Sequence, residues 1–265
     1  MKSYISNTFR GLILTEPFSV VMPVHNEEKL LRVSLPSIYQ LDPDEVILIL
    51  DRPADRSEEV AKKIGKKHDS DTRIEVVWKE VDWRFRVAYL RFYGFSLARN
   101  GMILSTDADF LLDEGIRNYL EEVRSGRYGL ISFGVLDYPL TYRSVMSLIM
   151  SKIFRYKSFA GPILFSKKAW LESKNEEEAK EWVYNDDIHI RRMISSKFPI
   201  KHVNTKTWHL RPSRMLLSDY KDGITYYSDL NERSMLRMFA RSFLMLRPSL
   251  FAGFVYAYKH KEKCR

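Results

Sequence analysis

The chain has 265 residues, of which 45% are hydrophobic and 29% are charged. This length and composition exclude an intrinsically disordered chain and leave room for one large domain, or one domain with an appendage, around a sizeable core. Lysine and arginine (43) outnumber aspartate and glutamate (34), and the net charge of +9 favours polyanionic partners such as nucleotide phosphates, anionic lipid or nucleic acid.

The first half of the chain alternates between predicted strands and helices. Residues 1–18 contain no unbroken apolar core of signal-peptide length, so we expect no leader there. Apolar runs predict strands at residues 18–24, 45–50 and 73–78, and a fourth that ends near Ile103 and Leu104. Helices fill the intervals, the second capped by Ser57 and the third from about residue 87 to 99. The alternation predicts a largely parallel sheet with helices on both faces.

Two carboxylates follow the fourth predicted strand. One residue, Ala108, separates Asp107 from Asp109, and the apolar run from Phe110 to Leu112 comes next. Burying carboxylates is costly unless a positive group meets them. Because ligands bind at the carboxyl ends of strands in open α/β sheets, a divalent cation carrying a phosphate is the natural candidate. The alternative is a turn whose aspartates cap a helix that begins near Asp113.

Four segments in this half resemble those of a known family. They are Val21-Met-Pro-Val-His-Asn-Glu-Glu28, the strand that ends at Asp51, Arg91-Phe-Tyr-Gly-Phe-Ser-Leu-Ala98, and Thr106-Asp-Ala-Asp109. Across about residues 18–112, their order and spacing resemble the nucleotide-binding segments of glycosyltransferase family 2. The resemblance implies an α/β fold of the GT-A type, a Rossmann-like, doubly wound, mostly parallel sheet with C-terminal helices. No glycine-rich phosphate loop follows any of the strands, so metal and side chains would have to hold the phosphates.

The resemblance also implies roles for individual residues. The base and ribose of a nucleoside-diphosphate sugar would be held by Pro23, His25, Glu27 and Asp51. Asp107 would approach the ribose or a metal-bound water, and Asp109 would ligate the Mg²⁺ or Mn²⁺ on the diphosphate. The sequence departs from the family pattern at His25, where tyrosine is frequent, and in the loop after Asp51, which is shorter than usual. UDP-, GDP- and dTDP-sugars therefore all stay candidates.

Arginine and aromatic residues are interleaved just before the acid pair. The arginines are Arg84, Arg86 and Arg91, and the aromatic residues are Trp83, Phe85 and Tyr89. Because arginine offers paired donors to phosphate oxygens, Arg86 and Arg91 are candidate diphosphate ligands. The alternatives are a solvated helix face and a surface for single-stranded nucleic acid. The nucleic-acid alternative leaves the acid pair unexplained.

A second acid pair stands in the acceptor half, residues 113–212. Strands are predicted at 129–135, 161–166 and 199–208, with an apolar segment at 145–154 and a charged helical run at 175–181. Asp186 and Asp187, followed by Ile190, resemble the Glu-Asp-x-x-Leu segment of the family, in which the second acid opens a helix and acts as the base. The alternative is that Asn185 or Asp186 is an ordinary N-cap.

Two histidines compete for a functional role in this half. His209 ends the last predicted strand before a basic loop, and in several GT-A enzymes a C-terminal histidine completes the metal site. His189 lies on the helix after Asp187, and we expect it to serve packing or to lie on the surface.

The C-terminal segment, residues 213–265, is predicted to be helical. Met235 to Leu246 mixes large apolar residues with Arg237 and Arg241, and residues 249–258 are apolar on every side. No run reaches the roughly 20 residues that span a bilayer. We expect this segment to contact the cytoplasmic face of a membrane peripherally, since each cation near an anionic leaflet can add roughly 1 kcal/mol. The alternative is that these helices complete the core of the catalytic domain, residues 1–212. The single cysteine, Cys264, excludes a disulfide framework and suits a reducing, cytoplasmic compartment.

These patterns and the resemblance predict a metal-dependent glycosyltransferase that moves a sugar from a nucleoside-diphosphate sugar to an acceptor hydroxyl on a glycan or lipid. The resemblance also implies that the configuration at the anomeric carbon is inverted. Asp187 would deprotonate the hydroxyl, and a cation on Asp109, with His209, would neutralise the departing diphosphate. One alternative is a nucleotidyltransferase, which would carry a glycine-rich basic loop where His25-Asn-Glu-Glu28 stands. A basic nucleic-acid-binding module is the other, although we expect no nucleic-acid partner.

Overall fold

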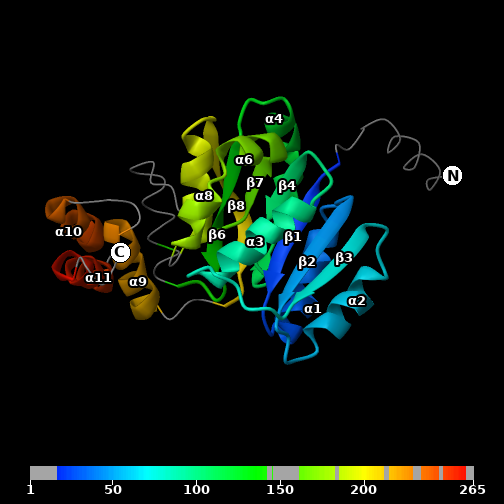
Figure 1. Cartoon of the computed structure of the whole chain (residues 1–265), viewed down its shortest axis with the longest axis horizontal. Helices are drawn as coiled ribbons and strands as arrows, with labels where there is room; N and C mark the ends of the chain where they lie inside the picture. Colours follow the sequence, from blue (N-terminus) through cyan, green and yellow to red (C-terminus); the bar gives the residue numbers. More distant parts are fainter. Residues whose placement is uncertain are drawn as a thin grey trace.

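The computed structural model describes residues 17–141, 145, 161–182, 185–211, 215–228, 234–244 and 247–260. Within these residues one sheet has the strand order β3-β2-β1-β4-β7-β6-β8-β5 (Figure 1). Its strands are β1 (Ser19–Val24), β2 (Glu45–Asp51), β3 (Asp71–Val77), β4 (Met102–Ser105), β5 (Phe110–Leu111), β6 (Leu130–Asp137), β7 (Ile163–Ser166) and β8 (Ile200–His209).

The first four strands are parallel to one another, and the later strands mix both directions. β1 pairs in parallel with β2 and β4, and β2 with β3. β7 runs antiparallel to β4 and β6, β8 is parallel to β6, and β5 is antiparallel to β8. The predicted α/β fold with a mostly parallel sheet is therefore confirmed. The parallel half ends its strands at one edge, where β1, β2 and β4 deliver the segments that begin at His25, Arg52 and Thr106.

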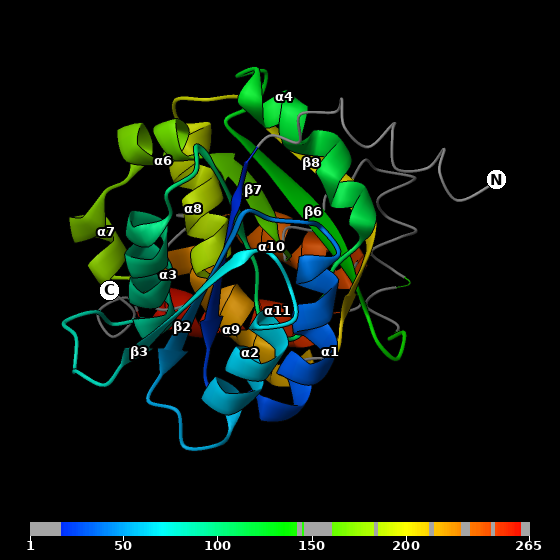
Figure 2. The same cartoon turned by 90° about the vertical axis from the view of Figure 1, so that its right-hand side faces the viewer.

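Helices cover both faces of the sheet because side chains alternate along the buried strands. One face packs against α1 (Glu28–Tyr39), α2 (Ser57–Gly65), the 3₁₀ helix η1 (Glu114–Tyr119) and α4 (Leu120–Arg124). The other packs against α3 (Arg86–Leu97), α6 (Lys167–Ser173), α7 (Glu176–Lys180) and α8 (Asp186–Ser195), as Figure 2 shows. In β1, Val20 and Met22 belong to the first cluster and Val21 to the second. Gly94 lets α3 lie close on this strand, since a Cβ there would come 2.4 Å from Val21 Cγ1.

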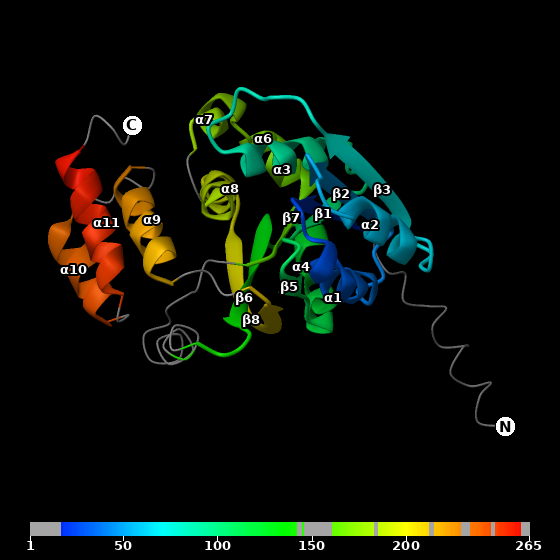
Figure 3. The same ribbon diagram turned by 90° about the horizontal axis from the view of Figure 1, so that it is seen from below.

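Three helices follow the sheet: α9 (Met215–Ser228), α10 (Met235–Leu244) and α11 (Pro248–Lys259). They lie together at one end of the molecule, with α9 between the other two helices and the sheet (Figures 1 and 3). Their buried apolar residues form a cluster of their own, Tyr227, Met238, Leu250, Phe254 and Ala257. In the described part of the chain, no helix has the length and apolar character needed to cross a bilayer. The proposed boundary at residue 212 stays a prediction.

Glycines allow α9 and α11 to cross at backbone contact. A Cβ on Gly223 would lie 2.0 Å from the carbonyl oxygen of Leu250, and one on Gly253 would lie 1.9 Å from that of Tyr220. Arg247, just before α11, is buried and donates from Nε to Asp219 at 2.8 Å and from Nη2 to Asp222. A paired internal charge and a tight crossing thus hold this unit together.

The local predictions near the site differ from the structure at two capping positions. Ser57, the expected cap, is instead the first residue of α2, after Arg56 at the N-cap position, and its N–H donates to Asp55 Oδ1 at 2.9 Å. Asp113 caps η1 by accepting from Gly115 N at 2.8 Å. Asp113 is therefore the cap of that helix, and the alternative that Asp107 and Asp109 cap it does not hold. The charged run at 175–181 contains α7, whereas the apolar segment predicted at 145–154 lies outside the described residues except for Val145.

Candidate active site

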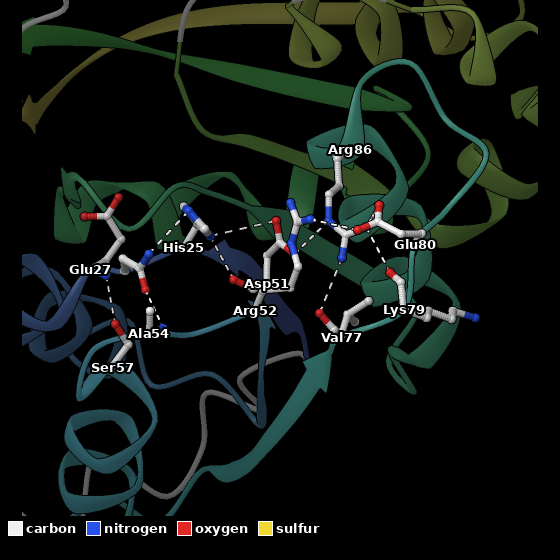
Figure 4. A network of polar contacts seen from close by, with 11 residues as sticks. His25, Glu27, Asp51, Arg52, Ala54, Ser57, Val77, Lys79, Glu80 and Arg86 are labelled. Atoms are coloured by element: carbon white, nitrogen blue, oxygen red, sulfur yellow. Dashed lines mark hydrogen bonds and ion pairs between the residues drawn. The ribbon is translucent and has the colours of Figure 1, made fainter.

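The ends of β1 and β2 carry the residues predicted to hold the base and ribose (Figure 4). His25 Nδ1 donates to the carbonyl oxygen of Asp51 at 2.8 Å, because a carbonyl can only accept. The Nε2 atom is then left as an acceptor, 3.4 Å from the side-chain amide of Asn26. The imidazole is 58% exposed, so it presents a fixed tautomer to solvent at the sheet edge. Pro23 lies inside β1 opposite Ile49 and is buried, so the predicted base contact by its ring does not fit this position.

Asp51 is the last residue of β2, and its carboxylate is only 9% exposed. Two guanidinium groups contact it: Arg86 Nε at 2.7 Å and Arg52 Nε at 3.2 Å, both on Oδ1. Arg86 also donates to the carbonyl oxygens of Lys79 and Val77, at 3.0 and 3.4 Å. Its donors thus hold Asp51 and the end of β3 in place, and its role as a direct diphosphate ligand stays a prediction.

Arg91, on α3, lies at the centre of the acidic residues. Its Nη2 donates to Asp107 Oδ1 at 2.6 Å, its Nη1 to Ser105 Oγ at 2.7 Å, and its Nε to Asp186 Oδ2. The side chain is 6% exposed. The guanidinium therefore joins the acid pair after β4 to the acid pair that begins α8, as the counter-ion that Asp107 and Asp186 share. Its role as a phosphate ligand stays a prediction.

The charges of this cluster shift one another's pKa values. Burial opposes the charge of Arg91, but the carboxylates of Asp107 and Asp186 outweigh it and raise its pKa, so the group stays cationic. Burial raises the pKa of Asp107 against the opposing charge of Arg91, and Asp109 and Asp186 raise it further. Burial also raises the pKa of Asp187, although Arg191 opposes this shift. A carboxyl whose pKa is raised is a stronger base once it has ionised.

Asp109 and His209 face each other, as predicted for a shared site. His209 Nε2 lies 3.3 Å from Asp109 Oδ2, and its Nδ1 lies 3.2 Å from Asp137 Oδ1. Burial disfavours the imidazolium, but the hydrogen bonds with both carboxylates raise the pKa of His209 to about 9. Asp137 thus orients the ring so that Nε2 points at Asp109, the arrangement of a carboxylate behind a metal-binding histidine.

Arg211 joins the two halves of the site. Its Nη2 forms an ion pair with Glu27 Oε1, and its Nε lies 3.7 Å from Asp109 Oδ2. The guanidinium is 55% exposed, so it borders the acid pair from the solvent side. Glu27 is in turn fixed through its N–H, which donates to Ser57 Oγ at 2.8 Å.

The donor atoms fit a hard divalent cation that the substrate helps to hold. Among the described residues, no three His, Cys, Asp or Glu side chains are grouped closely enough to form a complete metal cage. Mg²⁺ and related ions in phosphate-transfer sites keep waters and bind through one or two carboxylates plus substrate phosphates. Asp109 would supply a carboxylate oxygen of this kind, and His209 would add an imidazole nitrogen beside it. Asp107, the other carboxylate of the pair for which a cation was predicted, has one oxygen committed to Arg91.

Asp186 and Asp187 open α8, as the resemblance implied. Asn185 precedes them in the left-handed conformation, with φ 57° and ψ 47°. The alternative that Asn185 is an ordinary N-cap does not hold, because within α8 its side chain makes no capping bond; its amide instead donates to Asp222 Oδ1 at 3.4 Å and Thr225 Oγ1 at 3.2 Å of α9. Asp187 Oδ2 accepts from Arg191 Nη2 at 2.8 Å and is 22% exposed.

His189 takes the packing role that was expected of it. It is 2% exposed, and its ring stacks on Trp182 with centroids 4.6 Å apart and an interplanar angle of 16°. This histidine thus lies on the buried side of α8, whereas His209 lies at the candidate site.

Sequence reasoning missed two residues of the site. Asp137 ends β6, and nothing in its neighbourhood in the sequence marks it, because its partner His209 is 72 positions away. Arg211 lies in the basic loop noted after His209, so its charge was visible but its contacts with Glu27 and Asp109 were not. The pairing β6 with β8 aligns Asp137 with His209 and explains the first contact.

Comparisons with known proteins agree with this fold. The structure resembles S. aureus TarS 1–349 in complex with UDP, with a TM-score of 0.57, 13% identity, and 78% of this chain and 65% of that chain covered. It also resembles glucosyl-3-phosphoglycerate synthase from Mycobacterium tuberculosis in complex with Mn²⁺, UDP-glucose and phosphoglyceric acid (TM-score 0.53, 14% identity, 77% and 75% covered). A 4-diphosphocytidyl-2C-methyl-D-erythritol synthase from Anaerococcus prevotii matches with a TM-score of 0.50, 15% identity and 72% and 90% covered. At these identities the likeness shows the fold alone.

The family assignment comes from the sequence match. No curated protein sequence matches the chain. The chain spans about two thirds of TarS 1–349 and 39% of the longer TarS structure. Residues 19–170, more than half of the chain, match the model of the family described as Glycosyl transferase family 2. The chain therefore belongs to glycosyl transferase family 2.

Proposed function

We propose that this protein transfers a sugar from a nucleoside-diphosphate sugar to an acceptor hydroxyl, with Mg²⁺ or Mn²⁺ as cofactor. The observation that carries the proposal is the Arg91 cluster. It joins Asp107, from the segment expected to receive the donor, to Asp186, next to the expected base Asp187. A transferase needs its donor pocket and its acceptor base side by side, because the two substrates must meet in one geometry.

UDP is the first donor nucleotide to test. TarS was solved with UDP and the mycobacterial synthase with UDP-glucose, and by their likeness we infer a similar ligand here. The edge formed by His25 and Asp51 would take the base and ribose, with the imidazole fixed as an acceptor at Nε2. Arg211 is the guanidinium best placed for the diphosphate, since it is half exposed and borders Asp109.

The reaction would proceed as a single displacement with inversion. Asp187 accepts the proton of the acceptor hydroxyl while that oxygen attacks the anomeric carbon, and the bond from this carbon to the diphosphate oxygen breaks. The raised pKa of Asp187 suits this role, and Arg191 holds the carboxylate in position at 2.8 Å. A cation on Asp109 and His209, when bound, would neutralise the charge that develops on the leaving diphosphate. The acceptor would be a glycan or a lipid-linked glycan.

A nucleotide screen tests the proposal. Thermal unfolding is followed with UDP, GDP and dTDP, each with and without Mn²⁺, and a ligand at 100 times its Kd should stabilise the protein by about 2.7 kcal/mol. The active nucleotide is then supplied as its sugar conjugate, and released nucleoside diphosphate is measured. Metal-dependent release is the expected result. Stabilisation by a nucleoside triphosphate, with pyrophosphate released in the presence of a sugar phosphate, would instead indicate a nucleotidyltransferase. Stabilisation by single-stranded oligonucleotide alone would indicate a nucleic-acid-binding module.

A further inference from the structure

Helix α10 turns its apolar side outward. Four large apolar side chains on it are strongly exposed: Leu236 (77%), Phe239 (54%), Phe243 (71%) and Leu244 (48%). The side that packs against the rest of the unit contributes Met238 and Ser242, which are buried. A surface helix of a water-soluble domain has the opposite arrangement, with its apolar stripe against the core. An exposed apolar stripe of this kind marks a surface that binds a partner molecule or a membrane.

A shallow cavity extends the exposed surface onto the next helix. Its volume is about 220 Å³, and it is lined by Phe239, Ser242, Phe243, Pro248 and Phe251. Phe239 contacts Phe251 edge to face, with ring centroids 5.4 Å apart. We name the surface made by Leu236, Phe239, Phe243, Leu244 and this cavity the α10 surface.

The charge around the α10 surface selects its partner. Residues 234–260 contain four lysines and arginines and no aspartate or glutamate. Arg247 is buried and pairs with Asp219 and Asp222 inside the unit. Arg237 and Arg241 lie on α10 itself, and Lys259 ends α11. The guanidinium carbon of Arg241 lies 4.6 Å from the centroid of the Tyr226 ring of α9. An apolar face bordered by cations matches the interface of an anionic lipid leaflet, which offers acyl chains beneath negative headgroups.

We propose that the α10 surface docks the protein on the surface of an anionic lipid bilayer. Helices of 10 and 12 residues are roughly 15 and 18 Å long, about half the hydrocarbon thickness, so α10 and α11 would lie in the interface plane. Their position at the end of the molecule, beyond α9, leaves the sheet clear of the bilayer (Figures 1 and 3). The proposal goes beyond sugar transfer and does not depend on it.

Vesicle co-sedimentation of the full chain tests the docking. We expect binding to phosphatidylcholine vesicles that contain 30% phosphatidylglycerol, and at least tenfold weaker binding to phosphatidylcholine alone. Leu236→Glu/Phe243→Glu should lower the partition coefficient at least tenfold, because two inserted side chains become charged. Arg237→Gln/Arg241→Gln should lower it roughly tenfold at low salt, with a smaller effect at 0.5 M NaCl.

The matched control introduces the same charge on another exposed apolar residue. Leu171, on α6, is 53% exposed and lies far from the α10 surface in the sequence, and Leu171→Glu should leave vesicle binding unchanged. Thermal midpoints confirm that each variant is folded. If the double glutamate variant does not fold, Leu236→Trp replaces it, and quenching of its emission by brominated acyl chains reports insertion.

Three outcomes overturn the proposal. The first is wild-type protein that stays in the supernatant with anionic vesicles at low salt. The second is equal loss of binding in Leu171→Glu and in the double glutamate variant, which would indicate general charge repulsion. The third is a dimer in sedimentation analysis that Leu236→Glu/Phe243→Glu converts to a monomer without any vesicle binding, since a second copy would then cover the surface.

Discussion

Replacing Arg91 by methionine tests the central claim about the site, that one guanidinium is the counter-ion shared by Asp107 and Asp186. Methionine keeps most of the apolar volume but removes the charge that meets Asp107 and Asp186. Removing one partner of a buried ion pair costs about 3–5 kcal/mol, because the other charge is left without compensation. With a urea m-value of roughly 3 kcal/mol per molar, the unfolding midpoint should fall by about 1–1.7 M. Tryptophan fluorescence is a suitable signal, since all five tryptophans lie between residues 78 and 208.

The control is the same exchange in an exposed pair. Arg124 bonds to Glu121 at 2.6 Å with both side chains about half exposed, and Arg124→Met should hardly move the midpoint. Adding Asp186→Asn to Arg91→Met should restore part of the lost stability, because one buried charge is removed with its partner. If Arg91→Met and Arg124→Met shift the midpoint equally, Arg91 is not the counter-ion of the cluster.

Three further changes probe the metal ligand, the base and the terminal helices. Asp109→Ala should abolish nucleoside-diphosphate binding at physiological metal levels, as measured by calorimetry, and binding that survives both this change and EDTA would contradict the metal site. Asp187→Asn should lower transfer by about two to four orders of magnitude with nearly unchanged donor affinity; loss of transfer in Asp186→Asn alone would move the base by one residue. Gly223→Ala should destabilise the terminal helices by about 1–3 kcal/mol, because overpacking outweighs the better helix propensity of alanine. Faster amide exchange in α9 would report this effect, whereas Gly101→Ala, with nothing within 4 Å of the added methyl, should leave exchange unchanged.

The strands and the first acid pair could be predicted because their signals are local. β1 and β2 are apolar except for Ser19, Glu45 and Asp51 at their ends, and every residue in them is buried. Asp107 and Asp109 were placed at a strand end from the break in that apolar pattern, and the structure puts them just after β4. A parallel sheet collects such strand ends at one edge, so periodicity alone brings the loop after Asp51 near the same site.

The partners of the charged residues could not be predicted in the same way. Arg86 and Arg91 have the same chemistry and lie on the same helix, yet one meets Asp51, 35 positions away, and the other meets Asp186, 95 positions away. Arginine chemistry predicts that a carboxylate or a phosphate will be bound, but the register of α3 against β1 decides which. Gly94 lets α3 approach β1 closely. The distance between these two segments cannot be read from the sequence pattern, so the partners of the arginines cannot be read from it either.

The contact between α8 and α9 connects the terminal helices with the proposed base, Asp187. Asn185 adopts a left-handed conformation directly before Asp186, a conformation that costs a non-glycine residue free energy unless its surroundings hold it. The groups that hold its side chain are Asp222 and Thr225 of α9, and Asp222 is also a partner of Arg247. The first turn of α8, which carries Asp187, is thus anchored to the same unit whose α10 surface is proposed to meet a membrane. A shift of α9 would therefore act on the backbone one residue before the acid pair, and we expect it to move the proposed base, Asp187.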